Sequence, residues 1–395
     1  MPDAAPIYLD HAATAPLDPR VADLMSDCLR DPALQGNPAS VHAPGRAAAV
    51  RVELARGQVA RLIGAQPETI VFTSGATESV NLAILGAARA AADGTRHVVT
   101  ARTEHRAALD ACRQLVPEGF TIGWLKPGAD GSVDPGQVAA ALRADTALVS
   151  LMHANNETGA INDIGAVGRI CRERGLAFHV DAAQSAGKLP IDVEGMGVAL
   201  LSFCAHKLGG PKGIGALYLR HRPRPALQPL QFGGGHERGL RAGTLATHQI
   251  AGFGLACELA RLGLASEPAR IRALRERLWT GLQGAAPVAR NGAAEPRLPG
   301  ILNVRFPGVE GESLLLALDG RLAASSGSAC SSATAEPSYV LRALGLSDLA
   351  AQASLRLSLG RGTTEEEVDR AARLLVACVH RLRAALPAGA IEAIA

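Results

Sequence analysis

The stretch Leu201-Ser-Phe-Cys-Ala-His-Lys-Leu-Gly-Gly-Pro-Lys-Gly213 decides how this chain is interpreted. An apolar run typical of a buried strand leads to Lys207, and glycines and a proline follow it. A lysine at a strand end is partly desolvated, so its amine can lose its proton and form a Schiff base with an aldehyde cofactor. A surface lysine beside a turn is the commoner case for any single lysine, so the rest of the chain has to decide.

Apolar runs alternate with amphipathic helical patterns through the first two thirds of the sequence. The strand-like runs lie at 69–72, 97–100, 147–152, 177–180, 200–203 and 215–219. This alternation predicts an α/β fold with a mostly parallel sheet covered by helices. Such sheets bind ligands at the carboxyl ends of their strands, and the polar clusters of this sequence fall at those ends.

At 395 residues the chain is long enough for two domains. We expect a large domain over residues 14–260, whose last helix starts near Thr247. A smaller α+β domain would combine residues 1–13 with residues 261–395. Its predicted elements are a helix over 266–284, a strand over 300–306, a helix over 312–318, a small-residue loop over 323–334 and a strand over 354–359.

Composition excludes several classes of function. The formal net charge is +3 with no basic run, which argues against a nucleic-acid partner. No stretch is long and apolar enough to span a bilayer, and the first residues do not resemble a signal peptide, so we expect a soluble cytoplasmic protein. The seven cysteines are an odd number without close pairs, which predicts neither disulfides nor a zinc site but mostly buried, inert thiols.

Two further strand ends carry groups that suit an aldehyde cofactor with a ring and a phosphate. Asp181, in His179-Val-Asp-Ala-Ala-Gln, can keep a pyridine nitrogen protonated, although a strand-end Asp is more often a helix cap. In Phe72-Thr-Ser-Gly-Ala-Thr-Glu-Ser, the strand breaks and a helix opens, so the amides near Ala76 and Thr77 can hold a phosphate. An ordinary capped helix is the alternative there.

Other candidates follow the same logic. His105 can stack on a flat cofactor and move protons, while Asn156 and Gln184 can bind its ring oxygen. Cys330 sits in a loop of small residues that could carry a thiolate to a buried substrate, and Arg356 is a candidate clamp for a substrate carboxylate. Taken alone, Cys330 fits a packing turn and Arg356 an exposed strand position.

These segments together resemble the cysteine desulfurases of the class V aminotransferase family, in the group that supplies iron–sulfur cluster assembly. The matching motifs run nearly end to end: Tyr8-Leu-Asp-His-Ala-Ala-Thr, Gly36-Asn-Pro-Ala-Ser, Thr73-Ser-Gly-Ala-Thr-Glu-Ser, Thr103-Glu-His, His153-Ala-Asn-Asn-Glu, His179-Val-Asp-Ala, His206-Lys, Gly233-Gly-Gly-His-Glu-Arg-Gly, Ser325-Ser-Gly-Ser-Ala-Cys-Ser-Ser and Glu336-Pro-Ser-Tyr-Val-Leu-Arg-Ala-Leu-Gly. The resemblance implies a fold-type I enzyme that depends on pyridoxal 5′-phosphate (PLP) and acts as a homodimer.

The resemblance also assigns roles to residues. It implies that Lys207 carries PLP covalently, that Cys204 and His206 complete the phosphate site, and that Thr244 reaches the phosphate of the partner subunit. The expected reaction takes sulfur from L-cysteine, releases L-alanine and leaves a persulfide on Cys330, which passes to an iron–sulfur scaffold or another acceptor protein. No intrinsic metal is expected, although the Cys330 persulfide could be a transient ligand of an iron–sulfur cluster.

Three positions depart from the family pattern. Cys204 stands where a phosphate-binding Ser is usual, Ala15 where a second Thr is common, and Ala205 where a Gly precedes His206 and Lys207. A thiol donates weakly, so we expect changed kinetics but retained chemistry. A class V aminotransferase and a selenocysteine lyase would keep the same cofactor residues, and a non-enzymatic scaffold is the alternative from another class.

Overall fold

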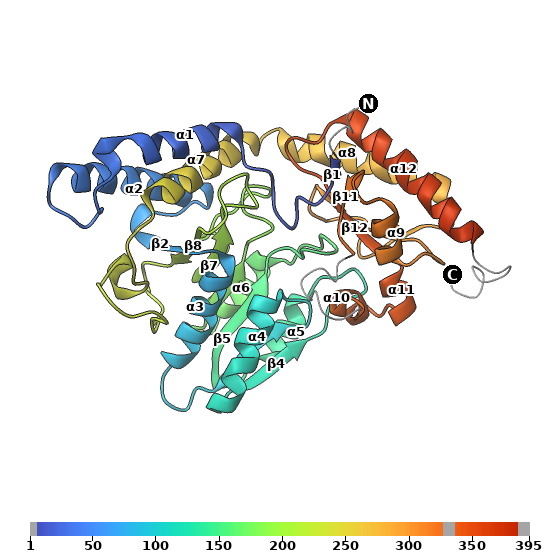
Figure 1. The fold of residues 1–395 in the computed structure, drawn as a ribbon. Helices are drawn as coiled ribbons and strands as arrows, with labels where there is room; N and C mark the ends of the chain where they lie inside the picture. Colours follow the sequence, from blue (N-terminus) through green and yellow to red (C-terminus); the bar gives the residue numbers. More distant parts are fainter. Residues whose placement is uncertain (1–5, 327–335, 386–395) are drawn as a thin grey trace.

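The computed structural model describes residues 6–326 and 336–385. Its central feature is a seven-stranded sheet in the order β2-β8-β7-β6-β5-β3-β4 (Figure 1). The antiparallel pairings are those that β8 makes with β2 and β7, and the remaining pairs are parallel, which confirms the predicted mostly parallel α/β architecture. The strands are β2 (Ile70–Thr73), β3 (His97–Ala101), β4 (Thr121–Leu125), β5 (Thr146–Met152), β6 (Ala177–Asp181), β7 (Leu200–Cys204) and β8 (Gly215–Leu219).

Helices cover both faces of this sheet, so most of its strands are mainly apolar and buried along their length. The helices are α1 (Pro19–Arg30), α2 (Ala43–Leu62), α3 (Ala76–Arg89), α4 (Arg106–Leu115), α5 (Pro135–Ala141), α6 (Ile164–Glu173) and α7 (Thr247–Gly263). Side chains of α2, α5, α6 and α7 share one apolar core with one face of the sheet, and those of α3 and α4 share a second core with the other face. Within β2, Phe72 joins the first core and Val71 the second, as the alternation of a strand requires.

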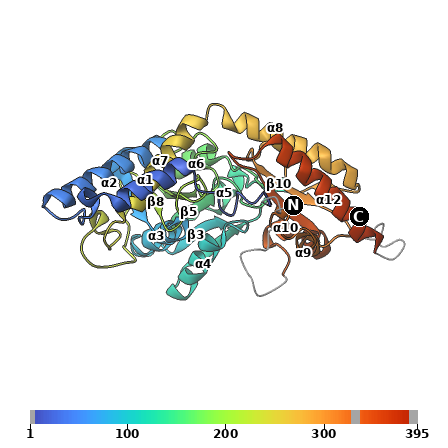
Figure 2. The same ribbon diagram turned by 45° about the horizontal axis from the view of Figure 1, so that its top comes forward.

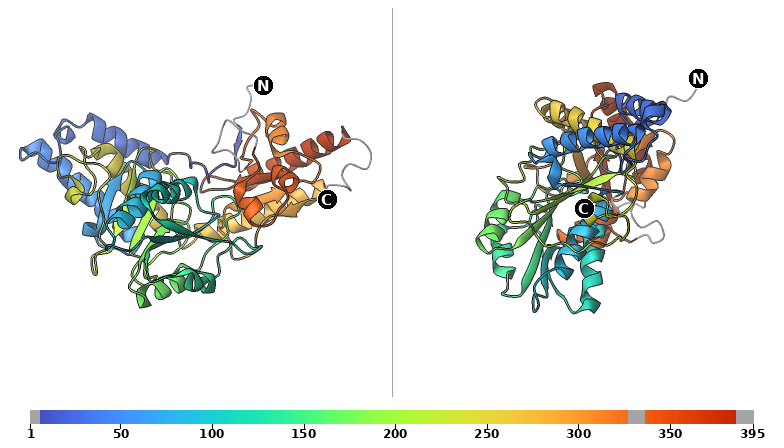
Figure 3. Two further views of the ribbon diagram at one scale, coloured as in Figure 1. Left: turned by 90° about the horizontal axis from the view of Figure 1, so that it is seen from below. Right: turned by 90° about the vertical axis from the view of Figure 1, so that its left-hand side faces the viewer.

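A third core lies in the C-terminal part of the chain, to one side of the large sheet (Figure 3). Long helices α8 and α12 run beside each other there (Figure 2) and cover an antiparallel sheet in the order β12-β10-β9. The N-terminal strand β1 pairs in parallel with β11, which brings residues from both ends of the chain into this part. Its elements are β1 (Ile7–Tyr8), α8 (Glu267–Leu282), β9 (Ala289–Arg290), β10 (Ile301–Arg305), α9 (Gly311–Ala317), β11 (Leu322–Ala323), α10 (Tyr339–Ala343), α11 (Asp348–Gln352), β12 (Ser354–Ser358) and α12 (Glu365–Ala384).

The proposed division of the chain into residues 14–260 and residues 1–13 with 261–395 stays a prediction, with which the residues of the cores can be compared. Both Ile7 and Leu9 belong to the C-terminal core, whereas Val21 belongs to the core of the large sheet. Helix α7 continues to Gly263 and α8 begins at Glu267, so the boundary proposed near residue 260 falls in the last turn of α7.

Within residues 6–326 and 336–385, no helix is long and apolar enough to cross a membrane, and no cluster of His, Cys, Asp and Glu could hold a metal ion. Six cysteines in the same ranges are free and buried, as expected: Cys28, Cys112, Cys171, Cys204, Cys257 and Cys378.

Candidate active site

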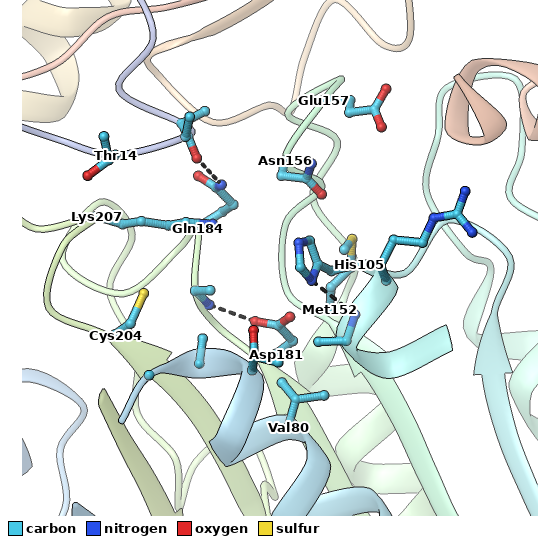
Figure 4. A pocket seen from close by; sticks show the side chains of 18 of the residues that line it. Thr14, Val80, His105, Met152, Asn156, Glu157, Asp181, Gln184, Cys204 and Lys207 are labelled. Carbon is cyan, nitrogen blue, oxygen red and sulfur yellow. Dashed lines mark hydrogen bonds between the residues drawn. The ribbon is translucent and has the colours of Figure 1, made fainter. Parts of the chain in front are cut away.

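A cavity of about 580 Å³ opens where the strands of the large sheet end. Segments that follow β2, β3, β5, β6 and β7 form its walls, because these parallel strands all present their carboxyl ends at this edge. The predicted site residues among its lining are Ala76, Thr77, His105, Asn156, Asp181, Gln184, Cys204, His206, Lys207 and Arg356. In Figure 4, Asp181 and Cys204 lie at the strand ends, with His105, Asn156, Gln184 and Lys207 around the space above them.

The N-terminus of α3 forms the anion-binding side of this cavity. The helix starts at Ala76, and its N-cap residue Gly75 makes no side-chain cap, so its first N–H groups are available to a ligand in the cavity. Strand β8 comes very close: a Cβ on Gly215 would lie 2.7 Å from the Gly75 backbone, so only glycine fits there. Burial raises the pKa of the Cys204 thiol, an effect that the nearby backbone N–H groups of Ala76 and Lys207 partly offset, and the thiol stays protonated.

Asp181 ends β6 inside the cavity and is only 6% exposed. One carboxylate oxygen accepts a hydrogen bond from the Ala183 N–H at 2.9 Å. Asp181 therefore does bind a following backbone N–H, as a helix-capping Asp would. This contact occupies one of its two carboxylate oxygens. A buried carboxylate has ample capacity for a further donor.

His105 caps the N-terminus of α4, which fixes how its ring is oriented. Its Nδ1 accepts a hydrogen bond from the Ala107 N–H at 3.2 Å, so the neutral ring carries its proton on Nε2. Burial lowers the pKa of His105; the nearby Asp181 carboxylate opposes this shift and the Lys207 ammonium adds to it. The ring is therefore neutral at pH 7 and can give or take one proton.

The N-terminal segment forms hydrogen bonds with the loop that carries Lys207. This role was not assigned to it from the sequence. Thr14 lines the cavity and its hydroxyl lies 3.2 Å from Nδ1 of His206, while the Ala15 N–H donates to the His206 carbonyl at 2.8 Å. Burial, with Lys207 and Lys212 nearby, lowers the pKa of His206 to about 4. The motif Tyr8–Thr14, which matches the family, was the only sequence signal for this segment. It did not indicate which residue Thr14 contacts.

Arg356 is buried in β12 and is 6% exposed, so the alternative of an exposed strand arginine is wrong. Its Nη1 donates to the Asn156 carbonyl at 3.0 Å and its Nη2 to Asp10 at 2.9 Å. Its Nε is buried with no hydrogen-bond partner among the described residues, and the same is true of Oδ1 of Asn156. A buried donor and a buried acceptor without partners indicate a site built for a polar ligand.

A second set of contacts that the sequence analysis missed joins the cavity to the segment after residue 335. The Ser338 hydroxyl donates to Glu157 at 2.5 Å, and the Tyr339 hydroxyl donates to the Glu104 carbonyl at 2.7 Å. Burial raises the pKa of Glu157 to about 7, an effect that Ser338 and two arginines partly offset. Segments far apart in sequence meet here, so no local pattern could reveal the contacts.

Two predicted residues are not among those that the structure brings together. Thr244 lines a separate shallow hollow with Phe232 and His236. Cys330 lies outside the described residues, and the segments that flank the undescribed range contribute Ser325 and Glu336 to the main cavity. The expected roles of Thr244 and Cys330 stay predictions.

Comparison with known proteins decides the family. The family model described as Aminotransferase class-V matches residues 7–371. A protein of Aeromonas hydrophila named cysteine desulfurase IscS is 56% identical over 383 residues, which cover 97% of this chain and 95% of that protein. This chain belongs to the class V aminotransferase family, among its cysteine desulfurases.

Solved structures of the family share the fold described above. A NifS-like protein superposes with a TM-score of 0.88 at 35% identity and covers 96% of this chain and 99% of its own. SspA in complex with cysteine superposes with a TM-score of 0.79 at 36% identity, over 89% of this chain and 98% of its own. The likeness spans both the large sheet and the C-terminal part, so the resemblance inferred from the motifs is confirmed.

Proposed function

We propose that this protein is a PLP-dependent cysteine desulfurase. It converts L-cysteine to L-alanine and places the sulfur on Cys330 as a persulfide for iron–sulfur cluster assembly or other sulfur transfer. The relatives named cysteine desulfurase support this activity, and a related structure contains cysteine. The observation that carries the proposal is the convergence of Lys207, Asp181 and an uncapped helix N-terminus on one cavity.

The residues around the cavity fit PLP. Its volume of about 580 Å³ is in the range of small-molecule sites and leaves room for an amino acid beside a cofactor. The first amides of α3, Thr77, Cys204 and His206 would hold the phosphate, and Asp181 would meet the pyridine nitrogen. The buried, unpartnered Oδ1 of Asn156 shows that part of this lining lacks a partner within the described protein. When bound, PLP supplies an aldehyde that captures amines and a ring that withdraws electrons.

Three side chains of the cavity would have separate roles in the reaction. Lys207, in the segment that follows β7, would hold the cofactor and move the α-proton of the substrate, since it lines the same cavity as Asp181 and His105. The neutral His105 ring would stack on the cofactor and exchange a proton with the substrate thiol. Arg356 would bind the substrate carboxylate through its free Nε, beside Asn156.

Cys330 would receive the sulfur. The C–S bond of the substrate breaks as an S–S bond to Cys330 forms, so L-cysteine and the thiol become L-alanine and the persulfide. Cys330 is five residues from Ser325, which lines the cavity, and five extended residues span about 17 Å. The chain therefore has the reach to bring this thiol to the substrate.

The remaining expectations belong to the same proposal. The protein would act as a cytoplasmic homodimer, with Thr244 completing the phosphate site of the partner subunit. A buried ion pair between Arg56 and Glu237, at 2.8 Å, ties the segment before Thr244 to α2, and Glu237 also accepts a hydrogen bond from the Phe72 N–H of β2. An anchored segment of this kind suits a residue that must reach another subunit.

The test is to incubate the purified protein with L-cysteine and a reductant and to measure sulfide and alanine together. Equal amounts of both from the parent, neither above background in a yellow Cys330→Ser variant, and normal release from Cys378→Ala would support the proposal. A keto acid without sulfide would indicate transamination, and faster turnover of selenocysteine would indicate a lyase. A protein that stays colourless with PLP would favour a non-enzymatic scaffold.

A further inference from the structure

Lys188 lies behind the candidate active site, in the segment between β6 and β7, and no role has been assigned to it so far. Its Nζ donates a hydrogen bond to Oε1 of Gln184 at 3.3 Å. It lines a second cavity, of about 260 Å³, between the large sheet and the C-terminal part. Lys207 lines both cavities, so the cavity that Lys188 lines adjoins the active-site cavity at Lys207.

The Gln184 amide is held from both of its ends. Its Nε2 donates to the Ala12 carbonyl at 2.8 Å, and its Oε1 accepts from Lys188. A flipped amide would set its oxygen against the Ala12 carbonyl and its NH₂ group against the Lys188 amine, so both partners enforce one orientation. Gln184 is 3% exposed and lines the active-site cavity, which leaves its second N–H as the group available to a ligand there.

We propose that Lys188 is a positioning residue that fixes the Gln184 amide so that its free N–H donates to the ring oxygen of PLP. This inference rests on the proposed function, because it assigns Gln184 to the cofactor. Without Lys188, only the Ala12 carbonyl would oppose rotation of the amide, and a rotated amide would present its oxygen to the anionic ring oxygen, which would repel it. Lys188 therefore acts through Gln184 and touches neither substrate nor cofactor.

The surroundings of Lys188 agree with a positioning role. Burial lowers the pKa of Lys188 to about 7, and the charges of Lys207 and Arg356 add to this shift. In the described part of the chain no carboxylate forms an ion pair with Lys188, and its Nζ donates a hydrogen bond to Gln184. An amine donates through N–H whether or not it is protonated, so the bond to Gln184 persists on both sides of this pKa.

A double-mutant cycle tests the inference through cofactor affinity, without using turnover. Holoprotein is dialysed against graded PLP concentrations, and bound cofactor is read from its visible absorption. We expect Lys188→Met to weaken PLP binding by about tenfold to a hundredfold, the loss of one hydrogen bond to a charged acceptor. Lys188→Arg, which keeps a donor, should stay within about twofold of the parent.

The decisive variant is Lys188→Met in a Gln184→Leu background, where the inference expects a further change below about twofold. An undiminished loss there would mean that Lys188 acts by its charge or by packing, and would overturn the inference. An unchanged affinity in the single Lys188→Met variant would also overturn it while leaving the proposed function intact. A parent protein that binds no PLP would overturn both.

Discussion

Replacing Arg356 by lysine tests the substrate-binding side of the site. Lysine keeps the positive charge, but it removes the Nε donor that is buried without a described partner. One charge-assisted hydrogen bond to a carboxylate contributes about 1.5–3 kcal/mol, and about 1.4 kcal/mol is a factor of ten. We therefore expect Arg356→Lys to raise the KM for L-cysteine by about tenfold to a hundredfold, with a smaller effect on kcat.

Steady-state sulfide release against L-cysteine concentration measures this change, and two variants serve as controls. Arg342 also lines the cavity entrance, but its side chain is 52% exposed and pairs with Asp348, so Arg342→Lys should change KM by less than about threefold. Asp10→Asn cuts the ion pair of Arg356 while leaving its guanidinium in place. A KM for Arg356→Lys within about threefold of the parent would refute the carboxylate role, as would an equal effect of Arg342→Lys.

Three further predictions follow from single contacts. Cys204→Ser should tighten PLP binding by about threefold to tenfold in the same dialysis assay, because a hydroxyl donates more strongly than a thiol; no gain would remove residue 204 from the phosphate site. Glu237→Gln should lower the free energy of unfolding by about 3–5 kcal/mol in urea, because it leaves the Arg56 charge buried and unpaired, and a loss below about 1 kcal/mol would contradict this. Burial raises the pKa of Glu157 from 4.5 to about 7, so its contribution to stability is full below pH 4.5 and falls by about 3 kcal/mol as the pH rises to 7. Glu157→Gln should flatten that part of the curve of unfolding free energy against pH. An unchanged slope would contradict the raised pKa of Glu157.

The sequence was sufficient for the fold because its strands are buried on both faces. Runs such as 177–180 and 200–203 are mostly apolar, with His179 and Ser202 bonded to each other inside the sheet, and each run is followed by polar residues at the edge where parallel strands end. That combination predicted both the sheet and the meeting of Asp181 with Lys207. Strand β4 was not predicted, because it lies at the sheet edge, its first four residues are not fully buried, and it contains Gly123.

Contacts between distant segments account for what the sequence could not supply. Arg356 binds Asp10 across 346 positions of the chain, and Ser338 binds Glu157 across 181. No periodicity reports such pairs, because they depend on how the two parts of the fold meet. The i, i+4 spacing of Gln184 and Lys188 is visible in the sequence, but only the structure shows that the amide also binds Ala12.

The central claim is that the sulfur of L-cysteine passes to Cys330, and it can be tested in a single turnover. Holoprotein is mixed with L-cysteine without reductant, and its peptides are analysed by mass spectrometry while released alanine is measured. The account predicts one additional sulfur atom on the peptide that contains Cys330, in proportion to alanine. Alanine release with no added sulfur on that peptide, or with the sulfur on another cysteine, would contradict it.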